Sequence, residues 1–184
     1  MCHILLHDPL FFKLLLRIDI DLAQQMHAQK CSCGGALHLA NYPRKPRGCP
    51  REVWDDYASR FSFCCSLCRK RSTPMSVRFL GRRVYLSLAV ALMSMRHTGS
   101  SARQTQLAAT LAIPARTLQR WRTWWSDAFP MTSLWQSQCA RFMPPVEMAE
   151  LPTSLLARFI GSVVESATRL LVFLMPLSVA QKSR

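Results

Sequence analysis

The sequence is poor in acidic residues, and one long stretch has none. Its 184 residues include 24 Lys and Arg but only 10 Asp and Glu, which gives a formal net charge of +14. No Asp or Glu occurs from Tyr57 to Ser126, a stretch with twelve Lys and Arg. Because solvated surfaces normally mix both signs, such a block is typical of a surface that binds a polyanion. Nucleic acid and anionic membrane surfaces are the two usual partners of this kind.

The sequence also lacks the motifs of several enzyme classes. It has no phosphate-binding loop, no glycine-rich dinucleotide motif, no Gly-x-Ser-x-Gly and no zinc deaminase signature. None of the ten acids lies in the strand setting that a two-metal nuclease or transposase core uses. No set of acid, base and nucleophile can be assembled, so we expect no enzymatic activity.

No apolar run is long enough and free enough of charge to cross a membrane. The run at 5–16 is interrupted by Asp8, Pro9 and Lys13 and lacks the cleavage site of a secretory signal. The apolar tail at 155–177 carries three charged residues, which favours an amphipathic helix or pair of helices. We therefore expect a cytoplasmic, nucleoid-associated protein with no membrane partner. In that compartment clustered cysteines indicate a metal more than disulfides.

Four of the eight cysteines have the spacing of metal ligands. Cys31 and Cys33 precede two glycines, and Cys65 and Cys68 precede a basic run. A zinc ribbon needs two such turns, each presenting two thiolates beside a strand, and period-2 patterns predict strands at 36–42 and 60–65. We expect these four cysteines to hold a structural Zn²⁺, with residues 43–59 as an insertion between the two turns.

Other ligand sets remain open at this point. Cys64 offers a wider spacing to Cys68, and His38 or His27 offers an imidazole in place of one thiolate. The alternatives to a metal site are buried free cysteines, which pack as small apolar side chains, and a metal-free ribbon.

The segment "SARQTQLAATLAIPARTLQRWRTWW" at 101–125 predicts a helix-turn-helix. It predicts helices at 102–111 and 115–127, the second with an apolar stripe of Leu118, Trp121 and Trp125. Two residues are unusual for this motif: Ala112 stands where glycine is common in the turn, and Pro114 stands at the cap. The alternative is a generic helical hairpin with a solvated face. The opposite face of the second helix holds side chains that can reach base edges, namely Arg116, Gln119, Arg120 and Arg122.

Two further basic segments flank the cysteine turns. Proline holds such segments extended, so that their cations can follow a phosphate backbone. We assign phosphate contacts to the basic residues of these segments, which are Arg44, Lys45, Arg47, Arg69, Lys70, Arg71, Arg82 and Arg83.

These patterns predict a mainly α protein with a small β zinc ribbon, in which a helix-turn-helix bundle follows the metal module. Four parts are expected along the chain. They are an N-terminal helix at 1–28, a ribbon-like basic module at 29–82, a DNA-binding domain at 83–135, and a Pro-rich connector with an apolar C-terminal helix at 136–184.

The order of these motifs carries a family resemblance over about residues 30–135. "CGGALHLANYPRKPRG", "SFCCSLCRKRSTPMSVRFLGRRVYL" and "LAATLAIPARTLQRW" together resemble small basic proteins of bacterial mobile elements. Those proteins are similar to the zinc-ribbon and helix-turn-helix part of insertion-sequence transposases without the catalytic domain. The resemblance implies sequence-specific binding of double-stranded DNA by an accessory protein or regulator. The alternatives are an interaction subunit that docks on a transposase or on a second copy of itself, and a truncated, non-catalytic transposase remnant.

Overall fold

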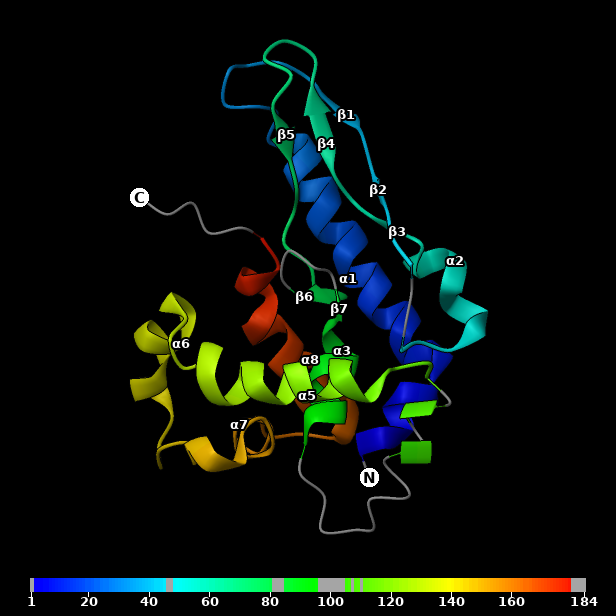
Figure 1. The fold of residues 1–184 in the computed structure, drawn as a ribbon. Coiled ribbons are helices and arrows are strands. Elements are labelled where there is room, and N and C mark those ends of the chain that lie inside the picture. The colour runs from blue at the N-terminus through cyan, green and yellow to red at the C-terminus, as the bar shows by residue number, and fades with distance from the viewer. Residues whose placement is uncertain are drawn as a thin grey trace.

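The structure is a computed structural model that describes residues 2–45, 48–80, 85–95, 105–106, 108–109 and 111–179. These residues form a mainly helical protein with a small antiparallel sheet at one end (Figure 1). The coarse fold class expected from the sequence is therefore confirmed.

Helix α1, Pro9–Ala28, forms most of the segment at 1–28 for which the sequence predicts an N-terminal helix. Its start is fixed by Asp8, whose side chain accepts a hydrogen bond from the Leu10 amide at 2.9 Å, and by Pro9 at the first helical position. A short 3₁₀ helix, Cys2–His7, precedes it. In Figure 1, α1 runs from the helical part of the molecule to the sheet, so it joins the two parts.

The sheet contains three strands in the order β1-β4-β5, all antiparallel. The strand β4 pairs with β1 through Leu37 opposite Cys65, and with β5 through Phe63 opposite Ser72. A separate pair, β2 with β3, closes the predicted insertion, which contains a 3₁₀ turn and the short helix α2. The bounds are β1 Leu37–Leu39, β2 Tyr42–Pro43, the 3₁₀ turn Arg51–Val53, α2 Trp54–Tyr57, β3 Ser59–Arg60, β4 Phe63–Cys65 and β5 Arg71–Ser72.

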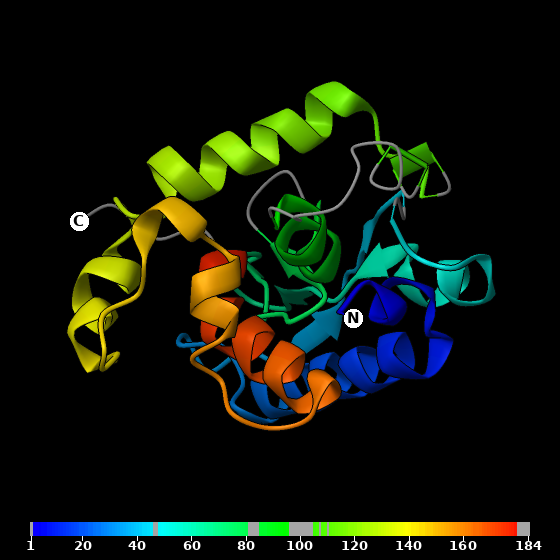
Figure 2. The same cartoon turned by 90° about the horizontal axis from the view of Figure 1, so that it is seen from below.

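The centre of the helical part is α3, Ser87–Ser94, in which every residue is buried. It follows a two-stranded pair, β6 Phe79–Leu80 with β7 Tyr85–Leu86. Helix α3 lies in the segment at 83–135 that the sequence predicts to contain the helix-turn-helix. Figure 2 shows α5 and α8 on different sides of α3, and both helices contact it.

Helix α5, Ala115–Thr123, lies where the second helix of the motif is predicted. It continues as one π-helical turn, Trp124–Ala128, in which the Phe129 amide donates to the Trp124 carbonyl at 2.8 Å. The wider turn brings Trp124, Trp125 and Phe129 within ring contact of one another, at centroid distances of 4.8 to 5.5 Å. Trp125 also donates its indole N–H to the Val90 carbonyl, which fixes α5 to α3.

The C-terminal part forms a pair of short helices rather than one long one. The longer, α8, begins with a capping box in which Ser162 and Glu165 each satisfy the other's backbone amide. Among the described residues no helix combines the length and the apolarity that a membrane span requires. The elements are α6 Ser133–Gln138, α7 Thr153–Leu156 and α8 Val163–Leu174, with 3₁₀ turns at Cys139–Arg141, Met148–Glu150 and Met175–Ser178.

A buried polar network holds the sheet end to the helical part. Asp19 on α1 accepts hydrogen bonds from the Ser76 hydroxyl, the Val77 amide and Arg78 Nε, the last at 2.8 Å. Arg60 donates to the carbonyls of Pro74 and Ser178. Arg60 and Arg78 belong to the twelve basic residues of the acid-free block, but both are buried. These two side chains contribute to folding and not to a surface, so the basic footprint is smaller than the sequence count suggests.

Candidate metal centre and basic surface

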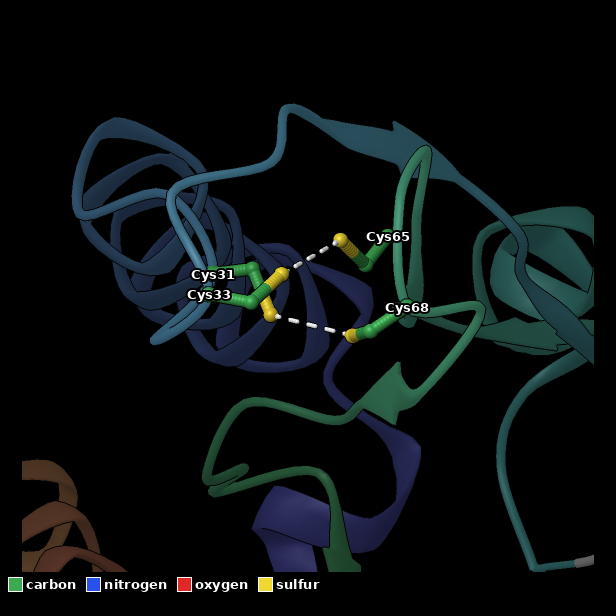
Figure 3. A group of neighbouring side chains, drawn as sticks. All are labelled: Cys31, Cys33, Cys65 and Cys68. Atoms are coloured by element: carbon green, nitrogen blue, oxygen red, sulfur yellow. Dashed lines mark hydrogen bonds between the residues drawn. The ribbon is translucent and has the colours of Figure 1, made fainter.

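Cys31, Cys33, Cys65 and Cys68 come together at the end of the sheet farthest from α5. All four sulfur atoms lie within 4.8 Å of one another. Figure 3 marks two of the sulfur contacts, Cys31 with Cys68 at 3.6 Å and Cys33 with Cys65 at 3.4 Å. Sulfur atoms bound to Zn²⁺ at about 2.3 Å in a tetrahedron are about 3.8 Å apart, so this spacing fits a metal. It is too long for disulfides, and all four cysteines are free.

Two tight turns deliver the sulfur atoms. In the first, the Gly34 amide donates to the Cys31 carbonyl at 2.8 Å, and the Cys31 amide donates to Gly35 at 3.1 Å. Gly34 has a left-handed φ of 82°, which favours glycine. Gly35 is required for a different reason, because a Cβ at this position would lie 2.5 Å from the Cys65 sulfur.

The second turn joins β4 to β5 and is closed by the Cys65 amide, which donates to the Lys70 carbonyl at 3.0 Å. The neighbouring Ser66 amide donates across to the Ala36 carbonyl at 2.9 Å, which ties the second turn to the first. The two cysteine pairs, which are more than 30 residues apart in the sequence, therefore form a single site because the sheet holds their two turns side by side.

Backbone amides around the cluster favour thiolates at two positions. The backbone amide of Cys68 is the main cause that lowers the pKa of Cys65, to about 6, although burial acts against it. The amide and thiol of Cys33 lower the pKa of Cys31. At Cys68 the Lys70 amide acts to lower the pKa, but the neighbouring thiols and burial outweigh it and the pKa rises to about 11. A divalent cation binds thiolates, so these amides prepare the cluster for one.

The structure selects one ligand set from those that the sequence left open. Among the described residues, no other group of His, Cys, Asp or Glu side chains is arranged to hold a metal ion. Cys64 faces away from the cluster toward the Arg69 carbonyl, at 3.5 Å. His27 packs on the ring of Phe63, with centroids 5.4 Å apart, and His38 is exposed on β1. Four protein ligands leave no position open for a substrate or water, so such a site is structural.

The outer face of α5 is basic and its inner face is apolar. Arg116, Gln119 and Arg120 are exposed, and Arg122 is half-buried. On the inner side the predicted stripe of Leu118, Trp121 and Trp125 is buried, as the sequence indicates.

The turn before α5 explains how alanine replaces the expected glycine. Ala112 adopts a left-handed φ of 51°. Its amide donates to the Ala109 carbonyl at 3.0 Å, and the Ile113 amide donates to the Ala108 carbonyl at 2.8 Å. These two bonds form a Schellman motif, which ends a helix and redirects the chain. Of the first helix, predicted at 102–111, the structure describes only residues 105, 106, 108, 109 and 111.

The remaining basic residues fall into two groups that the sequence did not distinguish. Arg69, Lys70 and Arg71 are exposed at the second cysteine turn, at the opposite end of the molecule from α5 (Figure 1). Arg44 and Lys45 instead line a cavity that also touches the turn before α5. Arg47, Arg82 and Arg83 lie outside the described residues.

Tyr42 contacts an arginine from each of these two basic groups. The sequence alone did not indicate this role for Tyr42. The guanidinium of Arg71 lies 4.2 Å from the centre of the Tyr42 ring, and that of Arg44 lies 5.2 Å from it. Arg71 also donates to the Ala40 carbonyl at 2.9 Å. One aromatic ring thus contacts two arginines that lie 27 positions apart in the sequence, Arg71 on β5 and Arg44 directly after β2. The signal in the sequence is only a tyrosine two residues before Arg44, and its contact with Arg71 depends on the packing of distant segments.

Comparison with protein-family models, with curated proteins and with solved structures finds no match to this chain. The functional argument therefore depends on the arrangement of its own residues.

Proposed function

We propose that this protein binds double-stranded DNA, with α5 reading bases and the cysteine-containing sheet contacting phosphates around a structural Zn²⁺. The resemblance of its motifs to insertion-sequence proteins favours a role as an accessory protein or regulator of a bacterial mobile element, acting at the nucleoid. The proposal includes no catalytic step.

The observation that carries the proposal is a series of neighbouring basic side chains that leads from the metal cluster to the turn before α5. It begins at Arg71 beside the second cysteine turn and continues across Tyr42 to Arg44. Arg44 and Lys45 line the cavity that Leu111 and Ala112 of the turn before α5 also line. Cations ordered by aromatic rings and backbone suit a phosphate backbone, because less side-chain entropy is lost on binding.

Helix α5 supplies what base recognition requires. Its exposed face carries Arg116, Gln119 and Arg120 within its first six residues, and arginine and glutamine suit the edges of guanine and adenine. In the helix-turn-helix motif the N-terminal part of the second helix approaches the bases. The Schellman turn at Ala112 and the buried stripe hold α5 on the core, so its outer face is presented as a rigid surface.

The donor set supports Zn²⁺ as the metal. Four thiolates in a tetrahedral arrangement suit zinc or an iron centre, whereas oxygen ligands suit calcium and magnesium. Zinc content by elemental analysis of the purified protein, together with the absorption of a cobalt-substituted sample, tests both the metal and its four sulfur ligands. A cobalt spectrum without tetrahedral thiolate bands would contradict the assignment.

The DNA-binding proposal is tested by selecting duplexes from a random pool and measuring affinity for the selected and a scrambled duplex at two salt concentrations. We expect Arg116→Ala and Arg120→Ala to remove the preference for the selected duplex. Lys70→Ala should weaken binding to both duplexes equally and reduce the salt slope by about 1. Arg17→Ala on α1, an exposed arginine outside the proposed surface, is the control. Unchanged preference in both α5 variants would show that α5 is not the recognition helix.

A second candidate function is an interaction subunit, and exposed apolar side chains favour it. Leu10 and Leu14, one turn apart on α1, are 75% and 41% exposed, and Ile160 before α8 is 83% exposed. Isolated apolar side chains are common on surfaces, but neighbouring ones on one helix face are typical of a docking surface. Sedimentation of wild type and a Leu10→Gln, Leu14→Gln variant separates the two functions. A strictly monomeric wild type that binds a selected duplex would exclude self-association as the role of this face.

A further inference from the structure

The cavity between the insertion and the turn before α5 has the composition of a nucleotide site. Its volume is about 750 Å³, within the usual range for small-molecule pockets. Three of its lining residues are Arg44, Lys45 and Arg51, and Glu52 is the only acidic residue that lines it among the described residues. A cavity with this charge balance favours an anionic ligand.

The cavity also contains an exposed aromatic ring that is held in place. Trp54 is 45% exposed, although it is a large apolar residue at the start of α2. Its indole N–H donates to the Cys49 carbonyl at 3.3 Å, which fixes the ring relative to the cavity wall. A fixed and partly exposed tryptophan beside several cations is a stacking platform of the kind that binds an unpaired base.

The wall behind this platform is rigid. Cys49 and Leu111 line the cavity and are buried, so part of its lining belongs to the main core. Gly48 has a left-handed φ of 85°, and a Cβ there would lie 3.0 Å from Cβ of Ala89 on α3. Gly48 therefore packs directly on the central helix, which fixes this part of the cavity wall.

We propose that this cavity binds one nucleotide, with its base stacked on Trp54 and its phosphate held by Arg51 and Lys45. An inorganic anion alone would leave the tryptophan and most of the volume unused. A phosphate of an intact duplex needs neither a cavity nor a stacking platform. The nucleotide is either free or an unpaired residue of a DNA strand, since both present the same base and phosphate. This site does not depend on base reading by α5.

The test is calorimetric titration of the full-length protein, as purified with its metal, with thymidine 5′-monophosphate, thymidine, inorganic phosphate and a single-stranded oligothymidylate. We expect the monophosphate or the oligothymidylate to bind more tightly than thymidine or phosphate. Binding of the free monophosphate assigns a free nucleotide, and binding of the oligothymidylate alone assigns a strand-borne one. Phosphate that binds as tightly as either nucleotide probe would overturn the proposal, since the base would then contribute nothing.

Matched variants separate stacking, charge and folding. Trp54→Leu should weaken binding by about 5- to 150-fold, the range expected for the loss of one base-stacking side chain. Trp54→Phe keeps an aromatic face without the indole N–H and should retain most of the affinity, which controls for loss of the hydrogen bond to Cys49. Arg51→Gln should weaken the nucleotide probes and leave thymidine unaffected.

Two controls identify the cause of a failure. Arg17→Gln removes an equally exposed arginine on α1, outside the cavity, and should change nothing. Arg116→Ala disables the proposed base reading by α5 and should leave nucleotide affinity intact, so failure of base reading and failure of nucleotide binding are distinguished. Nucleotide binding that is unchanged in both Trp54→Leu and Arg51→Gln, or absent from the wild type, would overturn this assignment.

Discussion

The glycine pair after Cys33 provides a sharp test of the metal centre. Gly34 and Gly35 are neighbours in one turn, but replacement by alanine has different consequences at each position. At Gly35 the new Cβ would lie 2.5 Å from the Cys65 sulfur, about 1 Å closer than ordinary van der Waals contact. At Gly34 nothing lies within 4 Å of the new Cβ, and only the left-handed φ of 82° is unfavourable.

The expected magnitude follows from this geometry. Metal–ligand distances tolerate shifts of about 0.2 Å, so a displacement of about 1 Å removes Cys65 from the coordination shell. A structural zinc site supplies about 10–16 kcal/mol, so one ligand of four accounts for roughly 3 kcal/mol, or about a hundredfold in affinity. Gly34→Ala should instead cost about 1–2 kcal/mol of folding free energy through its backbone conformation, with little change in the coordination shell.

The assay is competition with a chromophoric zinc chelator, combined with cobalt absorption to count sulfur ligands. We expect Gly35→Ala to bind zinc about a hundredfold more weakly and to lose one thiolate from the cobalt spectrum. Gly34→Ala should keep the four-sulfur spectrum and melt at a lower temperature. A Gly35→Ala protein with four thiolates and zinc affinity close to that of wild type would refute the proposed packing of the first turn against Cys65.

Three further predictions concern folding. Ala112 has a left-handed φ of 51°, so Ala112→Gly should raise the free energy of unfolding by about 1 kcal/mol, and a lower Tm would contradict the Schellman turn. Asp19→Ala leaves the buried Arg78 charge without its carboxylate and should lower stability in urea by about 3–5 kcal/mol, whereas Asp19→Leu with Arg78→Met should restore part of it. Burial raises the pKa of the Cys49 thiol from 9.0 to about 12, because the buried site disfavours the thiolate. The contribution of the neutral thiol to the free energy of unfolding is therefore complete below about pH 9 and falls as the pH rises toward 12. The same burial should make Cys49 slower than half-buried Cys139 to react with a thiol reagent at pH 8, and equal rates would contradict it.

The sequence predicts well those features that depend on local periodicity. The buried stripe of α5 follows from helical spacing, and an N-terminal helix is present within 1–28 as expected, although its start at Pro9 was not predicted. Spacing also favours Cys31, Cys33, Cys65 and Cys68 as the ligand set, but it leaves Cys64, His27 and His38 open, and only the structure separates these from the cluster. Even the positive φ at Ala112 is anticipated by the position of glycine in similar turns.

Other features depend on contacts between residues far apart in the sequence, so local sequence patterns did not predict them. An arginine buried against a carboxylate has the same sequence pattern as an arginine on a surface, so Arg78 could not be separated from its exposed neighbours. The cavity at Trp54 forms only when the insertion packs against the turn at Leu111, and no periodic pattern indicates that approach. The π-helical turn after α5 arises from aromatic packing at Trp124 and Phe129, which overrides the regular helix that the sequence predicts.

The position of the metal cluster in the fold indicates what the metal contributes. The sheet end has its own small apolar cluster of Ala23, Leu37, Phe63 and Cys65, separate from the main core around α3. These buried side chains are few for three strands of two or three residues each, and a metal bound by the four cysteines would add stability to this end of the molecule. Removing the metal with a chelator should therefore increase amide hydrogen exchange in β1, β4 and β5, while α3 and the inner face of α5 remain protected. Because Arg71 lies on this sheet and α5 does not, DNA affinity should fall while preference for a selected duplex persists. Uniform loss of protection across α3 would instead show that the two parts fold as one unit.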